Sequence, residues 1–508
     1  MTTSISNASV EVLTHETAAQ IEPALEQSRA EPVHTLASRF IFLVLCLAIV
    51  LSTLAYGTVH YWSLAVFQAG AALIILLWAI DAWRSGDLRV SRNPLQWPLL
   101  GLLIIGLVQL LPFGGTSGAG ALSVEPVRTL SLDPYSTRLT LVRLFALFIY
   151  FAAALVFTDS SHRLRLLVRT IIIFGFLLAI LGLIQSFTRP TKVYWLRELQ
   201  QSTPFGPFIN RHHFAGYMEL TMALPLGLLF SGAVEREKSF IYIFAAGMMG
   251  IALIMTNSRG GIISLFAEAA FLVAVTGFRR KHGRHHATQK HGRMRGALVR
   301  AGLGLSLVLA ILIGVILLGG EAALSRFVGT VNAEDPTTGR AHYWSVTLDI
   351  IRNHPLIGTG LGAYGVVYTR YDSRNGLFRL EQAHNDYLQV IADAGLLGAA
   401  LGLLFLVALF RLGSARLETE DRFRRGVATG ALAGCFAVLV HSFFDFTLHT
   451  TSNALLFLIL AALATLNGRV ERAEQKRRRR KRHRRRSSTP LSGIYKQVQE
   501  SAVLPVKK

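Results

Sequence analysis

The stretch LLVRTIIIFGFLLAILGLIQSF, residues 166–187, has a single charged side chain, Arg169. A helix needs about 20 mostly apolar residues to cross the hydrocarbon core of a bilayer. Arg163, Arg165 and Arg169 stand at the N-terminal end of this stretch. Basic residues beside a membrane span mark its cytoplasmic end. The stretch therefore predicts a transmembrane helix that starts on the cytoplasmic side.

Similar apolar stretches recur along the whole chain. They lie near 38–56, 62–83, 95–112, 139–157, 166–187, 213–233, 239–256, 260–278, 300–319, 384–410, 426–446 and 452–467. Basic residues follow every second stretch, which places those sides and both termini in the cytoplasm. We expect an all-α polytopic membrane protein with about twelve transmembrane helices and a large extracytoplasmic loop between spans nine and ten.

The composition agrees with a membrane protein, but the net charge needs an explanation. Apolar residues make up 52% and charged residues 16%, against about 25% charged in soluble proteins. Nearly all of the +22 charge lies in 279–300, with eight Lys/Arg and no acid, and in 468–508, with fifteen Lys/Arg and three acids. Neither basic cluster is interleaved with aromatic residues, as single-strand nucleic-acid binding requires. We interpret both as topology signals that contact membrane lipids, with no nucleic-acid partner.

The two ends of the chain differ in composition from the span-rich middle. Residues 1–37 are polar and lack the apolar region of a signal peptide, so we expect a disordered cytoplasmic N-terminus. Residues 468–508 include RRRRKRHRRR, which cannot bury a core, and predict a basic disordered cytoplasmic tail. The transmembrane domain is expected over 38–467. Cys46 and Cys435 lie in apolar runs and favour packed side chains over a disulfide framework.

The large outer loop, 320–383, contains two recognisable segments. Its sequence predicts a helix from Arg340 to about Asn353, ended by Pro355, with Arg340, Trp344 and Thr347 on one face. The glycine-rich run GTGLGAYG follows at 358–365. A phosphate cradle would need a strand–turn–helix context, which is missing here. The run favours a turn that docks the loop onto the membrane domain.

Four polar clusters fall where predicted spans begin or end on the outer side. They are 210–213 (NRHH), 257–261 (NSRGG), 382–387 (QAHNDY), and the trio His441, Asp445 and His449. Asp386, Gln389 and Asp393 extend the third cluster as a polar stripe along one helix face. Because polar groups inside membrane spans are costly, such groups tend to mark functional sites.

Each cluster also has a structural interpretation. Arg259 can snorkel to the interface, and His384-Asn385 can cap a helix. His441, Asp445 and His449 at i, i+4 and i+8 would share a helical face, as a hydrogen-bonded stripe or as metal ligands. Their convergence on one membrane face favours function. Arginines at helix N-termini bind phosphate, and a nearby histidine can act as general base. The clusters therefore predict a site for a lipid-linked phosphate or pyrophosphate.

These motifs resemble the bacterial O-antigen ligase and O-antigen polymerase superfamily. The similarity runs from about 40 to 467, so that the expected 38–467 domain is O-antigen ligase-like and 320–383 is its large periplasmic loop. The motifs are FINRHHFAGY (208–217), TNSRGG (256–261), TGRAHYW (338–344), NHPLIGTGLGAYG (353–365), QAHNDYLQVIADAGLLG (382–398) and HSFFDFTLHT (441–450).

The resemblance implies a membrane glycosyltransferase that moves a glycan from undecaprenyl pyrophosphate to an acceptor hydroxyl at the outer face of the inner membrane. The acceptor is a lipid or a glycan. The resemblance also implies an inverting, metal-independent reaction without a cofactor, which argues against a metal at His441 and His449. A polymerase of lipid-linked repeats shares this chemistry. A transporter of lipid-linked glycans is the alternative from another class, because Glu219 and Glu268 lie inside predicted spans.

The resemblance also assigns roles to individual residues. His384 is expected to be the base for the acceptor hydroxyl. Arg259 and Arg211 are expected to contact the donor pyrophosphate, and Arg340 a phosphate or a sugar. Three neighbours of these residues are expected to help bind substrate: His212, Asn385 and Asp386.

Overall fold

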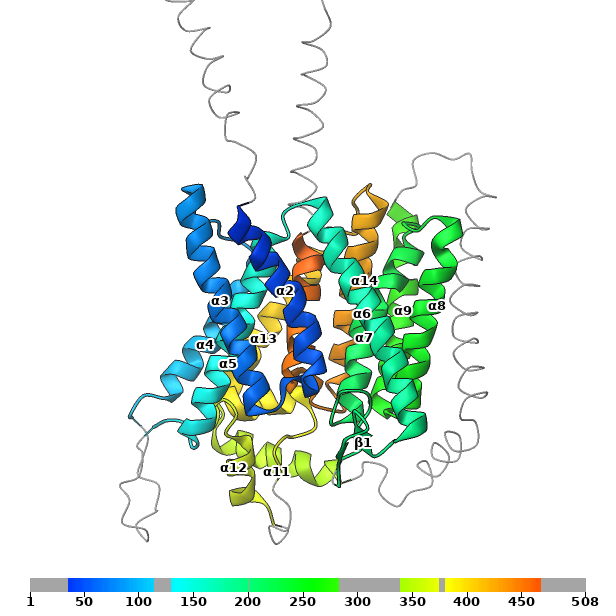
Figure 1. The fold of residues 1–508 in the computed structure, drawn as a ribbon. Helices are drawn as coiled ribbons and strands as arrows, with labels where there is room; N and C mark the ends of the chain where they lie inside the picture. The colour runs from blue at the N-terminus through cyan, green and yellow to red at the C-terminus, as the bar shows by residue number, and fades with distance from the viewer. Residues whose placement is uncertain (1–34, 114–128, 201, 283–338, 374–379, 467–508) are drawn as a thin grey trace, which may run out of the picture.

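The computed structural model describes residues 35–113, 129–200, 202–282, 339–373 and 380–466 (Figure 1). Helices dominate these segments. Strands form one short antiparallel hairpin within them, β1 (Lys192–Val193) with β2 (Arg197–Glu198). The predicted all-α class is confirmed.

Among the described residues, eight helices are long and apolar enough to cross a membrane. They are α2 (Leu36–Leu54), α3 (Tyr61–Ser85), α5 (Pro134–Phe157), α6 (Ser161–Thr188), α8 (Arg236–Met255), α9 (Arg259–His282), α13 (Asp386–Ser414) and α14 (Arg422–His441). Three more helices match predicted spans: α4 (Gln96–Gln109), α7 (Arg211–Phe230) and a final helix, Thr451–Leu466. The polytopic membrane architecture is thus confirmed. The predicted ninth span, 300–319, lies outside the described residues.

The bundle has two distinct edges (Figure 1). The blue start of α2 and the orange end of the final helix lie at the upper edge. The loop helices α11 (Arg340–Asn353) and α12 (Tyr364–Tyr371), together with the β1 hairpin, lie at the lower edge. Because the start of α2 and the end of the final helix lie at the same edge, the chain between them must cross the bundle an even number of times. The assignment of that edge to the cytoplasm stays a prediction, and most of the expected disordered ends lie outside the described residues.

The large loop docks onto the membrane domain as its sequence predicts. Helix α11 has the predicted bounds. In the glycine-rich run, the Thr359 N–H donates to the Ala392 carbonyl at 2.9 Å, and the Leu361 N–H donates to Gln109 Oε1 on α4 at 2.9 Å. The Gly362 N–H donates to Asp393 Oδ2 on α13 at 3.1 Å. Residues 358–365 are therefore a docking turn.

Two glycines allow the backbones of this turn and α13 to touch. Helix α13 is interrupted at Gly395, where φ is 67° and an added Cβ would lie 2.2 Å from the Leu356 carbonyl oxygen. Opposite, Gly358 has a φ of 69° and its Cβ would lie 2.4 Å from the Asp393 carbonyl carbon. Only glycine adopts these positive φ values readily.

Helices α7 and α14 also approach through glycine. A Cβ on Gly227 would lie 2.3 Å from the backbone nitrogen of Gly430, and a Cβ on Gly430 would lie 2.4 Å from the Ala223 carbonyl oxygen. Small residues of this kind let membrane helices pack backbone to backbone. The two helices run antiparallel, so the start of α7 lies beside the end of α14.

Replacing Gly395 by Ala should destabilise the protein, because the new methyl group meets the Leu356 carbonyl and a positive φ costs an alanine about 1–3 kcal/mol. Thermal unfolding of the purified protein in detergent measures the effect. Gly247→Ala on α8 is the matched control: its Cβ meets nothing within 4 Å, and Ala should stabilise that helix by about 0.5–1 kcal/mol. Equal melting temperatures for the two variants would contradict the docking described here.

Candidate functional site

A small polar pocket of about 100 Å³ lies at the lower edge of the bundle, where several helices begin or end. It is lined by Arg211, His212, Asn257, Ser258, Arg259, Gly260, Arg340, His441, Phe444 and Asp445. Four of the predicted site residues thus come together here: Arg211, His212, Arg259 and Arg340. The arginines share one feature, since each is the first residue of its helix, α7, α9 or α11. Exposed N–H groups at a helix start add to the positive potential of an arginine.

Asp445 is the anion that organises this pocket. Its side chain is 1% exposed. Oδ2 lies 3.4 Å from Nη2 of Arg340 and 3.8 Å from Nδ1 of His212, while Oδ1 lies 3.3 Å from Nδ1 of His384 and accepts the Phe446 N–H at 2.9 Å. Burial alone would raise the pKa of Asp445, but the hydrogen bond with His384 and the nearby histidines hold that pKa well below its usual value. Asp445 is therefore a permanent carboxylate.

His384 sits beside the polar pocket in a constrained conformation. Its φ of 52° is unusual for a residue with a side chain and costs about 1–3 kcal/mol. The imidazole contacts Phe446 edge-on, with ring centroids 4.8 Å apart, and lies 6.2 Å from the ring of Tyr343 on α11. Trp344 Nε1–H donates to the carbonyl of the preceding residue, Ala383, at 3.1 Å. Helix α11 thus holds the segment that presents His384.

The turn before α9 explains the NSRGG motif. Asn257 has a φ of 54°, which asparagine tolerates better than most residues. Ser258 Oγ accepts the Gly261 N–H at 3.2 Å and so caps the start of α9. A Cβ on Gly260 would lie 2.7 Å from Cδ2 of His441, so only glycine leaves space for that ring. The motif therefore brings Arg259 and Ser258 close to the end of α14.

His441, Asp445 and His449 do not share a helical face, and the prediction that they do is wrong. Helix α14 ends at His441, so the predicted span 426–446 is too long, and His449 lies in a 3-10 turn. The backbone turns because Asp445 and Ser442 find partners outside the helix. His449 Nδ1 lies 2.5 Å from Oδ1 of Asp386, whereas His441 Nδ1 lies 2.8 Å from Oε1 of Glu219. Among the described residues, no group of three or more His, Cys, Asp or Glu side chains is arranged to hold a metal ion.

Asn385 and Asp386, predicted to bind substrate, have partners inside the protein and do not line the polar pocket. Asn385 Oδ1 caps α13 by accepting the N–H groups of Tyr387 and Leu388 at 3.0 and 3.1 Å. The capping interpretation is thus confirmed for Asn385. Asp386 accepts the Ser442 hydroxyl at 2.8 Å. Both residues fix the turn after α14 against the start of α13.

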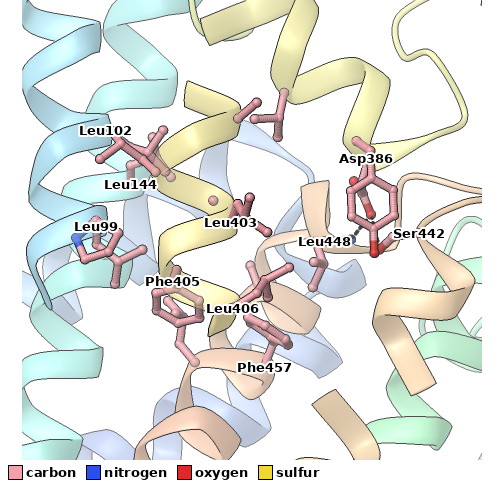
Figure 2. A pocket seen from close by; sticks show the side chains of 18 of the residues that line it. Leu99, Leu102, Leu144, Asp386, Leu403, Phe405, Leu406, Ser442, Leu448 and Phe457 are labelled. Atoms are coloured by element: carbon pink, nitrogen blue, oxygen red, sulfur yellow. Dashed lines mark hydrogen bonds between the residues drawn. The ribbon is translucent and has the colours of Figure 1, made fainter. Parts of the chain in front are cut away.

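A second, apolar pocket of about 360 Å³ lies between α4, α5, α13 and the final helix (Figure 2). Figure 2 shows Asp386 and Ser442 at one end, joined by a hydrogen bond, with Leu102 and Leu144 from α4 and α5 across the pocket. Other lining side chains are almost all aliphatic or aromatic, including Leu99, Leu403, Phe405, Leu406 and Phe457. The pocket therefore suits a hydrocarbon chain, and its polar end lies at the turn 442–448.

Comparison with known families adds an independent observation. Residues 244–403 match the model of the O-antigen ligase family. This match supports the O-antigen ligase and polymerase superfamily for this part of the chain. The matched residues include Arg259, Arg340 and His384. No curated protein matches the chain.

The family match and the apolar helices together support a multi-pass membrane glycosyltransferase of the O-antigen ligase or polymerase type. Proteins of this type act on a lipid-linked glycan and an acceptor.

The sequence motifs pointed to the right region but not to all of its residues. Ser258 received no role, although it touches two histidines, and Asp445 was grouped with the wrong partners. Glu219, noted only as an acid inside a span, forms a fully buried pair with His441, Oε1 to Nδ1 2.8 Å. Glu219 lies eight residues after Arg211, which is about two helical turns, and therefore on the same face of α7. This spacing is the sequence signal that links Glu219 to the site.

Asp445→Asn should destabilise the protein, because hydrogen bonds to a charged group contribute about 1.5–3 kcal/mol. The depressed pKa makes this contribution fully present above the unfolded carboxyl pKa of about 3.9, and it is lost only as the pH falls toward the folded value. Asp445 is therefore ionised at both about pH 6 and about pH 8, and the substitution should destabilise the protein at both. Unfolding of the detergent-purified protein at both pH values measures it.

The control is Asp349→Asn. Asp349 pairs with Arg352 on the exposed side of α11 at 2.7 Å, and exposed pairs contribute about 0.2–1 kcal/mol. A loss at Asp445 no larger than that at Asp349 would contradict the central position of Asp445.

Proposed function

We propose that this protein transfers a glycan from undecaprenyl pyrophosphate to an acceptor hydroxyl at the outer face of the inner membrane, as a ligase. The observation that carries the proposal is the polar pocket, where three arginines each begin a helix. Three guanidinium groups and three helix N-termini suit a group with several negative charges, and a pyrophosphate is such a group. The family match supports the same class of donor.

In this proposal Arg211 and Arg259 hold the donor pyrophosphate, and Arg340 contacts phosphate or sugar. Negative charge accumulates on the pyrophosphate as the glycosidic bond breaks. Arginines already placed around the pocket stabilise that charge without reorganising. Arg340 itself is held by Asp445, which fixes its guanidinium at the pocket wall.

His384 is the proposed base for the acceptor hydroxyl. Nδ1 of His384 pairs with Asp445, so Nε2 of His384 is the nitrogen that accepts the proton from the acceptor hydroxyl. The acceptor oxygen then bonds to the anomeric carbon from the face opposite the leaving pyrophosphate. Inversion of configuration at the anomeric carbon follows from this arrangement. Arg211 and Arg259 supply the positive charge, and His384 supplies the base. Asn385 and Asp386 act by positioning, since their side chains bond within the protein.

The apolar pocket is the proposed site for a lipid chain of the donor. It lies among helices of the bundle, and its polar end is the turn 442–448, which also carries Asp445. A chain there remains in the hydrocarbon layer while its head group is at the outer membrane face. This arrangement lets a polyprenyl substrate react without leaving the bilayer.

His384→Ala should lower glycosyl transfer by at least about 100-fold, because general base catalysis contributes about 10²–10⁴-fold. Transfer is measured in membranes that contain the native donor, with the protein level checked by immunoblot. His342→Ala is the matched control. His342 also lies on the outer edge and pairs with an acid, Asp372, at 2.8 Å, but it does not line the polar pocket. If His384→Ala kept full glycosyl transfer at a normal protein level, His384 would not be the base of the reaction.

Deletion of the gene separates the ligase from its alternatives. With surface glycans resolved by length, a ligase predicts long lipid-linked polymer that no longer reaches its final carrier. Single unpolymerised repeats would instead identify a polymerase with the same chemistry. Movement of a labelled lipid-linked glycan across the membrane, without glycosyl transfer, would identify a transporter.

A further inference from the structure

A chain of hydrogen bonds leads from the polar pocket into the interior of the bundle. His212 Nδ1 lies 2.8 Å from Ser258 Oγ, and Ser258 Oγ lies 3.3 Å from His441 Nε2. His441 Nδ1 lies 2.8 Å from Glu219 Oε1. His441 and Glu219 are both fully buried, whereas the His212 side chain is 22% exposed and lines the pocket. The chain therefore connects a buried carboxylate on α7 to the pocket surface.

Ser258 makes this chain directional. A hydroxyl has one proton to donate and two lone pairs, and the Gly261 N–H occupies one lone pair. One donor and one acceptor position remain for the two imidazoles. Hence one ring donates to Ser258 while the other accepts from it. The chain has two arrangements, and they differ by one proton on the outermost nitrogen, Nε2 of His212.

The cost of burying these groups argues that they have a function. A carboxylate and an imidazole that are buried as a pair lose their hydration, and their mutual attraction offsets only part of this cost in free energy. The other oxygen of Glu219 and both oxygens of Glu268 on α9 are buried without a hydrogen-bond partner among the described residues. Ionisable groups placed inside a membrane domain at this cost are typical of proton pathways.

We propose that Glu219, His441, Ser258 and His212 form a relay that donates a proton to the leaving pyrophosphate. This inference rests on the proposed function, because it requires the pyrophosphate in the polar pocket. The relay would be the general acid of a reaction in which His384 is the general base. His212 is the group that touches the substrate, and the other three residues act through it.

The proton transfers balance as follows. The bond between the anomeric carbon and the pyrophosphate oxygen breaks, and its electron pair goes to that oxygen. His212 Nε2 gives its proton to the pyrophosphate, Ser258 gives its proton to His212 Nδ1, and His441 Nε2 gives its proton to Ser258. His441 becomes neutral and still donates from Nδ1 to Glu219. Solvent takes the acceptor proton from His384 and returns one to Nε2 of His212, from which the reverse transfers through Ser258 restore the proton on His441 Nε2. A full cycle therefore moves no net proton.

Glu219 is the closest charged partner of His441, which is why it controls the relay. The charged or titratable groups around His441 come from every neighbouring element: Glu219, Arg211, His212 and His213 on α7, Arg259 and Glu268 on α9, Arg340 on α11, Asp386 on α13, and Asp445 in the turn after α14. Among the acids in the part of the chain that the structure describes, Glu219 is the one within hydrogen-bond distance of the His441 ring.

The test measures glycosyl transfer across a pH series, in membranes that contain the native donor. If the relay supplies the proton, Glu219→Gln and Ser258→Ala should each lower the rate by at least about 100-fold and remove the fall in rate at high pH that loss of the relay proton gives the wild-type protein. Phosphorus NMR of inorganic pyrophosphate with the full-length, detergent-purified protein should meanwhile show that both variants still bind it. Ser258→Ala cuts the chain without changing a charge, so it tests the relay even if Glu219→Gln fails to fold.

Thr221→Val is the matched control. Thr221 lies two residues from Glu219 on α7, and within the described residues its buried hydroxyl donates to backbone carbonyls, so the pH–rate profile of Thr221→Val should equal that of the wild-type protein. Identical pH–rate profiles in wild type and Ser258→Ala would overturn the relay and leave the pyrophosphate pocket in place. Failure of wild-type protein to bind pyrophosphate, or unchanged binding in Arg259→Ala, would overturn the proposed donor pocket and the relay with it.

Discussion

The glycine contact between α7 and α14 is the constraint on which the rest of the site depends. With Gly227 and Gly430 at the crossing, the two backbones meet without intervening side chains. The end of α14 then lies beside the start of α7, and the α9 turn fits against both through Gly260. Any larger residue at these contacts would separate the helices and the polar groups that they carry. A packing rule for membrane helices thus fixes a chemical arrangement at their ends.

Much of the architecture follows from local sequence. Apolar length predicts the spans, and α11 is bounded correctly because Gly339 and Pro355 flank an uninterrupted helical pattern. The turn after His441 was not predictable in this way. Its sequence, HSFFDF, continues the apolar character of α14, and the chain turns because Ser442 and Asp445 bond to other elements. Such partners are distant in sequence and become visible only in three dimensions.

The candidate site shows the same division. Residue types and their position at the outer edge were enough to predict Arg211 and Arg259 for a phosphate site, because arginine beside a helix start has a clear chemical meaning. Arg340 was predicted through the family resemblance. The distinction between residues that face the pocket and residues that support it was not available. Asn385 and Arg259 look equally polar in the sequence, yet one caps a helix and the other lines the pocket. Side-chain direction decides between the two roles.

The apolar pocket between α4, α5, α13 and the final helix has a kinetic consequence. A substrate whose hydrocarbon chain lies in this pocket arrives by lateral diffusion in two dimensions. Its effective concentration is then its mole fraction among the lipids, and the volume of the surrounding water does not enter. Excess detergent would dilute such a substrate and slow the reaction even if every protein molecule stayed folded. Turnover of such a substrate would therefore depend on the membrane composition as much as on the side chains in the site.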